Sequence, residues 1–180
     1  MGGIRGTQPP LRGRGLRGCV SVLVAATLVA ACGDDEPASR DVDPAAALTA
    51  IVEWQAGDQE PVVDDNGDTL LPVIYMAAGD GGTIDVGVQA AVAAAVIDVA
   101  TIRFADDVAD AFDASLEGEP VIDDGVMLLI GTMPEPARTV VVPLQRFTDS
   151  TTAEALELEI RHDPRPSGIG TATVIAVTPP

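Results

Sequence analysis

The sequence predicts an α+β fold, with a mainly antiparallel sheet and two helices packed on one of its faces. In the first half of the chain, apolar residues recur at steps of three and four, which is typical of helices with one buried face. In the second half, short apolar or alternating segments follow one another between Gly and Pro residues, which is typical of consecutive strands. The alternative is a β-sandwich in which the alanine-rich segment after Asp85 forms a pair of strands.

The first helix is predicted over residues 44–56. Asp43 can serve as its N-cap, and Pro44 suits the first helical position, where the missing N–H costs nothing. Three apolar residues then recur at helical spacing: Leu48, Ile51 and Val52. Gly57 supplies a stop signal.

An acidic, turn-rich stretch is expected over 57–69. The continuous apolar run from Leu70 to Ala78 then predicts a strand, despite Pro72 near its start. A second helix is predicted over about 85–97, because apolar residues again recur at helical steps: Val88, Val92, Ala95, Val96 and Val99.

The remainder is predicted to be mostly β. A short strand is expected over 101–104 and an acidic helical turn over 106–113. Four strands are predicted after it, over 126–130, 139–146, 156–161 and 171–177. Strict alternation in the third of these places three side chains toward a core: Leu156, Leu158 and Ile160. The sequence Asp123-Asp124-Gly125 predicts a turn in which the glycine supplies a positive φ.

The N-terminal segment carries the signals of export. Four arginines, Arg5, Arg12, Arg14 and Arg17, precede an apolar run that extends to Ala31 and is too short to span a bilayer permanently. The run ends Val29-Ala30-Ala31-Cys32, which resembles the lipobox of a bacterial lipoprotein signal peptide. The resemblance implies that Cys32 is linked to a diacylglyceryl group and becomes the first residue of the mature chain.

This resemblance organises the chain into three parts: a signal peptide over 1–31, an acidic tether over 32–42 and a single globular domain over 43–180. The protein is then expected at the extracytoplasmic face of the cell membrane, anchored to it by lipid without spanning it. No disulfide or thiolate site is expected in the domain, because Cys19 leaves with the signal peptide and Cys32 carries the lipid.

The mature chain is strongly acidic. All 28 Asp and Glu residues follow Cys32, whereas only six of the ten basic residues do, so its net charge is −22. Such a surface is repelled by nucleic acid and by anionic headgroups, so a nucleic-acid partner is not expected and the membrane association depends on the lipid.

Residues that carry chemistry are few. The one histidine, His162, precedes Asp163 on a predicted strand, and adjacent strand residues point to opposite faces, so the two do not make a catalytic pair. The best metal candidates are Asp64, Asn66 and Asp68, which alternate as in a calcium loop. This loop has Thr69 at the position of the turn glycine and Tyr75 at that of the closing glutamate, so a solvated turn is the expectation. No cofactor is expected.

The sequence therefore favours a non-catalytic interaction or ligand-binding module of the cell envelope, with an envelope protein or small ligand as partner. The alternative is a carboxylate-dependent envelope hydrolase, which needs an acid and a base about 5 to 9.5 Å apart. Acids buried in a deep cleft would favour the enzyme, and acids spread over the surface would favour the module. Among the few aromatic residues, Trp54 is the best placed for an exposed contact, although simple packing is expected.

Overall fold

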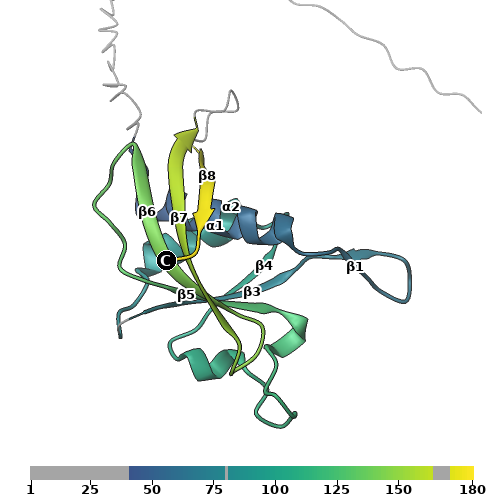
Figure 1. Ribbon diagram of the computed structural model, residues 1–180. Helices are drawn as coiled ribbons and strands as arrows, with labels where there is room; N and C mark the ends of the chain where they lie inside the picture. The colour runs from purple at the N-terminus through teal and green to yellow at the C-terminus, as the bar shows by residue number, and fades with distance from the viewer. Residues whose placement is uncertain (1–40, 80, 164–170) are drawn as a thin grey trace, which may run out of the picture. The chain divides into compact units, whose positions relative to one another are not determined.

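The computed structural model describes residues 41–79, 81–163 and 171–180 (Figure 1). Its helices and strands are α1 (Pro44–Asp58), β1 (Val62–Val63), β2 (Thr69–Leu70), β3 (Val73–Ala78), α2 (Val86–Ala95), β4 (Thr101–Phe104), the 3-10 helices η1 (Val108–Ala111) and η2 (Ile122–Asp124), β5 (Val126–Ile130), β6 (Thr139–Phe147), β7 (Ala153–Asp163) and β8 (Thr171–Thr178). This is an α+β fold, as predicted.

Both helices begin at an aspartate. Asp43 Oδ1 accepts a hydrogen bond from the N–H of Ala46 at 2.8 Å, and Asp85 Oδ1 accepts from Gly87 and Val88. These bonds satisfy N–H groups that have no partner inside the helix. The alanine-rich segment is helix α2, so the β-sandwich alternative is wrong.

Six strands form the main sheet, in the order β4-β3-β5-β6-β7-β8. Pairing is antiparallel from β5 to β8, but β3 is parallel to both β4 and β5. Parallel neighbours need a crossover connection. Helix α2 supplies it between β3 and β4, and the segment with η1 and η2 connects β4 to β5.

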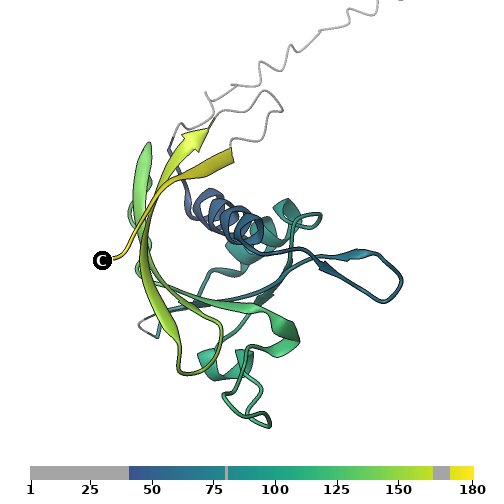
Figure 2. The same ribbon diagram turned by 45° about the vertical axis from the view of Figure 1, so that its right-hand side comes forward.

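The main core lies between the sheet and both helices. Figure 2 shows α1 in the hollow of the curved sheet. Leu156, Leu158 and Ile160 are buried in this core, as the alternation predicted. A smaller core lies on the other face of β3 and β5: Tyr75, Ala77, Ala111, Val121 and Met127. The connection from β4 to β5 therefore covers the second face of these central strands.

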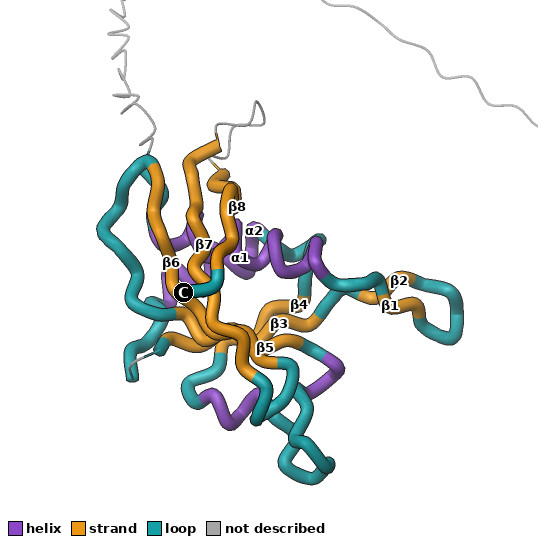
Figure 3. The backbone as a smooth tube through the Cα atoms, viewed as in Figure 1, coloured by secondary structure: helices purple, strands orange, loops and turns teal. Residues whose placement is uncertain are grey.

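Strands β1 and β2 form a hairpin that projects from the rest of the described domain (Figures 1 and 3). We call residues 62–70 the arm. Val62 pairs with Leu70 and Val63 with Thr69. The predicted strand over 70–78 is thus divided, because Pro72 has no N–H to donate and β3 begins after it, at Val73.

The described chain enters the fold at Val42. This residue is buried, and its N–H donates to Ala137 O at 2.7 Å. The end of the predicted tether, 32–42, therefore belongs to the folded part, since an apolar residue next to a helix cap can join the core. Residues 1–31 and most of the tether lie outside the described residues. No helix in the described ranges is long and apolar enough to cross a membrane.

Candidate functional site

A recess of about 500 Å³ lies at the base of the arm. Its walls come from the arm, from the end of α1 and from the N-terminal ends of β3 and β4; most of the lining side chains are apolar, including Val62, Leu70 and Leu71. The other lining residues are polar, and four of them are charged, so the recess offers both apolar contact and charge to a partner.

Arg103 is the one cation in the lining of the recess. It faces Tyr75 across the β3–β4 pair, and its Nη1 donates to Tyr75 Oη at 2.5 Å. The same nitrogen lies 2.7 Å from Asp123 Oδ2, and the guanidinium carbon lies 5.4 Å from the centre of the Tyr75 ring. These contacts, with Tyr75 first and Asp123 second, raise the pKa of Arg103 above its ordinary value. Arg103 therefore stays charged, and its charge is already matched by Asp123.

The turn beside Arg103 has a conformation that the sequence did not predict. Asp123 and Asp124 have positive φ values of 59° and 51°, whereas Gly125 is extended at φ −81° and ψ −173°. The prediction that the glycine supplies the positive φ was wrong. Glycine is required at 125 by close approach, because a Cβ there would lie 2.8 Å from Val73 O.

Two glutamines near the recess have unsatisfied polar atoms. Gln55, which is 2% exposed, has no partner for Oε1, and Gln59 Nε2 is also buried without one within the described part of the chain. Gln59 lines the recess. A buried polar atom without a partner costs about 1 to 3 kcal/mol, so a ligand that hydrogen-bonds Gln59 would recover part of that cost.

The three calcium-ligand candidates, Asp64, Asn66 and Asp68, lie at the tip of the arm, where a solvated turn was expected. Asp64 Oδ1 accepts from the backbone N–H of Asp68 at 2.9 Å and of Asn66 at 2.8 Å. These two bonds, with Asp68 first, lower the pKa of Asp64. The carboxylate therefore closes a turn, with Gly67 at φ 89°. Over the described ranges, no group of three or more His, Cys, Asp or Glu residues could hold a metal ion.

The other predicted residues lie elsewhere. Trp54 is half-buried on α1, with the Arg146 guanidinium 5.8 Å from its ring centre. Arg146 also forms ion pairs with Asp58 and Glu154, so this cluster ties α1 to β6 and β7. His162 is half-buried on β7, opposite Ala172. Cys32 lies outside the described residues.

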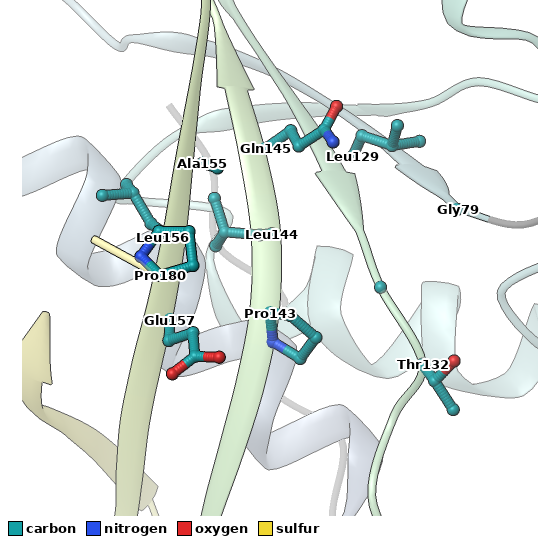
Figure 4. Close-up of a pocket in the computed structure, with 11 residues that line it drawn as sticks. Gly79, Leu129, Thr132, Pro143, Leu144, Gln145, Ala155, Leu156, Glu157 and Pro180 are labelled. Atoms are coloured by element: carbon teal, nitrogen blue, oxygen red, sulfur yellow. The ribbon is translucent and has the colours of Figure 1, made fainter. Parts of the chain in front are cut away.

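Two further concavities are smaller. A groove of about 340 Å³ on the outer face of the sheet is lined by Pro143, Gln145 and Glu157, from the neighbouring strands β6 and β7 (Figure 4). Another, of about 420 Å³, lies at the carboxyl ends of β3 and β5, where its one acid, Asp85, already caps α2. Neither combines apolar walls with an unpartnered buried polar atom.

Comparisons with protein-family models, with curated proteins and with solved structures found no match for this chain. The function must therefore be argued from the chain's own residues.

Sequence reasoning missed the recess because its residues are distant along the chain. The arm, Arg103 and Asp123 come together only when β4 lies beside β3. One local signal was available: Val62 and Val63 are adjacent valines inside an acidic stretch that was expected to be solvated.

Proposed function

We propose that this chain is a lipid-anchored protein of the extracytoplasmic membrane face, and that its domain is a non-catalytic interaction or ligand-binding module. One observation supports the module over the hydrolase. No carboxylate is buried among the described residues, where the buried polar side chains are Thr49 and Gln55. A carboxyl group becomes a general acid at neutral pH when burial or a like charge raises its pKa.

A general acid at neutral pH needs a raised carboxyl pKa, but the carboxyl pKa values that shift in this domain are lowered. The pKa values of Asp64, Asp113 and Asp149 are lowered, in each case by hydrogen bonds from nearby turn residues. These three side chains serve local structure. The apolar recess at the arm is then the feature best suited to contact a partner.

The anchor is tested by fatty-acid labelling of cells that express the full chain. Cys32→Ser is expected to abolish incorporation of an alkyne-tagged fatty acid and to leave the chain either unprocessed or released from the membrane fraction. Cys19→Ser is the matched control and should be labelled like the wild type, because that residue precedes the proposed cleavage site. Undiminished labelling and membrane fractionation of Cys32→Ser would disprove the anchor.

The hydrolase alternative has its own test. Glu60 and Asp124 line the recess, and they are the acids that such an activity would use there. The full chain is assayed on chromogenic glycosides and on purified cell-wall glycan. Hydrolysis by the wild type that is lost in Glu60→Gln or Asp124→Asn would show that the domain is an enzyme and would contradict the module proposal.

A further inference from the structure

The arm and the residue that follows it, Leu71, expose apolar side chains that no described element covers. Val62, Val63, Leu70 and Leu71 are 58%, 56%, 49% and 42% exposed. Isolated two-stranded hairpins are at best marginally stable in water, so a hairpin that exposes its apolar residues gains from a covering surface. Val62 and Leu70 are directly opposite in the pairing, and both line the recess.

The strand next to the recess, β4, is one of the two edge strands of the main sheet. Among the described strands, β4 pairs only with β3. The N–H groups of Thr101 and Ala105 donate toward β3, to Pro72 O and Met76 O. Since alternate residues of a strand point their backbone groups in opposite directions, Ile102 and Phe104 direct their N–H and C=O groups to the open side. An extended peptide could pair with these groups by strand addition.

The charges around the recess favour a cationic partner. Arg103 is matched by Asp123, whereas Glu60 and Asp124 also line the recess and form no ion pair within the described residues. Three more acids, Asp64, Asp65 and Asp68, lie at the arm tip, and the arm contains no basic residue. A second copy of this acidic chain would be repelled here, and a basic segment would be attracted.

We infer that the recess binds an extended segment of a partner protein in which apolar and basic residues alternate. The segment adds a strand to the edge of β4, places its apolar side chains against Val62 and Leu70, and places its basic side chains near Glu60 and Asp124. The inference rests on the proposed interaction role. Peptide titration and fatty-acid labelling at Cys32 are independent experiments, so the peptide site can be disproved without disproving the lipid anchor, and the reverse.

The test uses the full chain in non-ionic detergent and a fluorescent peptide of alternating valine and arginine. A length of about ten residues, at ~3.3 Å each, is enough to pass β4 and reach the arm. Saturable binding is expected, and it should weaken as salt rises from about 0.05 to 0.3 M. A valine–glutamate peptide should not bind. A valine–arginine peptide that is N-methylated at every residue should bind at least about tenfold more weakly, because it has no N–H left to donate to the edge of β4.

Variants locate the site. Val62→Ser with Leu70→Ser should weaken binding at least about tenfold, or about 1.4 kcal/mol. Val86→Ser with Val141→Ser is the matched control: both side chains are exposed valines away from the recess, and this pair should bind like the wild type. Glu60→Gln is expected to weaken binding and reduce its salt dependence.

Hydrogen exchange on the wild-type chain needs no variant, and the peptide should slow exchange at residues 62–71 and 102–104. The inference would be overturned if the valine–arginine peptide did not bind, or if the methylated peptide bound equally well. It would also be overturned if both double variants lost the same affinity, or if exchange slowed only outside these segments. Self-association of the chain that is lost in the arm variant would show that a second copy occupies the recess, which would also overturn it.

Discussion

Gly125→Ala tests how tightly the central strands are joined. The φ of Gly125 suits any residue, so its conformation is not what requires glycine. A Cβ at this position would lie 2.8 Å from Val73 O and 3.1 Å from Ile122 O. Both are backbone oxygens that cannot rotate away. The β3–β5 ladder begins at the next residue, where Ile74 pairs with Val126, so the start of this ladder must shift.

The magnitude follows from two opposing effects. Forcing a methyl group into a packed site costs about 1 to 3 kcal/mol. Replacing Gly by Ala also restricts the unfolded chain, which recovers about 0.4 to 1 kcal/mol. We expect Gly125→Ala to lower the free energy of unfolding by about 1 to 2 kcal/mol. Gly57 is the matched control, because it lies inside α1 with no atom within 4 Å of its Cβ position. Gly57→Ala should stabilise by about 0.5 to 1 kcal/mol.

Urea unfolding of the chain from Gly33 onward, followed by Trp54 fluorescence, measures both changes. Trp54 is the one tryptophan and packs against the main core from α1. The two substitutions are chemically identical and are predicted to have opposite signs. Equal effects, or a Gly125→Ala variant as stable as the wild type, would refute the close approach between β3 and the turn before β5.

Three further outcomes are expected. Asp149→Ala should destabilise the fold at about pH 6, and this effect should disappear toward pH 2. Hydrogen bonds led by Thr151 lower the pKa of Asp149 to about 2 in the folded protein. The stabilisation from Asp149 is therefore complete above its ordinary pKa of 3.8 and is lost as the pH falls through the folded value. Thermal midpoints across this range measure it, and a loss that is independent of pH would contradict it. Val42→Ala should cost about 2 kcal/mol in urea unfolding, and no change would exclude Val42 from the core. Calorimetric calcium titration should be unaffected by Asp64→Asn with Asp68→Asn, since the Asp64 carboxylate already closes a turn; a saturable, calcium-selective site lost in this variant would show the opposite.

Elements defined by local signals could be predicted from the sequence. Helix α1 was predicted from Asp43, Pro44 and its apolar spacing, and β7 from strict alternation over 155–161. In both cases the determining features are local in sequence. For α1 they include the N-cap hydrogen bond, and for β7 they are the alternation of side chains between the two faces of the strand. The ends were less certain, and β7 begins at Ala153, earlier than predicted.

Strand partners could not be predicted in the same way, because pairing joins distant segments. The parallel neighbours of β3 were missed, although its continuous apolar run was a usable signal. Strands buried on both faces lack alternation, and this is typical of parallel strands. Both β3 and β5 are of this kind, with Tyr75 and Met127 in the smaller core while Ile74 and Leu128 lie in the main one. The arm was missed because strands of two residues have no measurable period.

Three departures from ordinary folding rules meet at the recess. Val62 and Leu70 expose apolar surface where a solvated hairpin would be polar. Asp123 and Asp124 adopt left-handed conformations, which cost most residues about 1 to 2 kcal/mol each and which glycine would adopt freely. Gln59 buries an amide nitrogen that has no hydrogen-bond partner among the described residues. The outer-face groove between β6 and β7 has none of these three features. Unfavourable local features that occur together are typical of functional sites. Their occurrence at the recess is the strongest physical reason to expect that the partner binds at the arm.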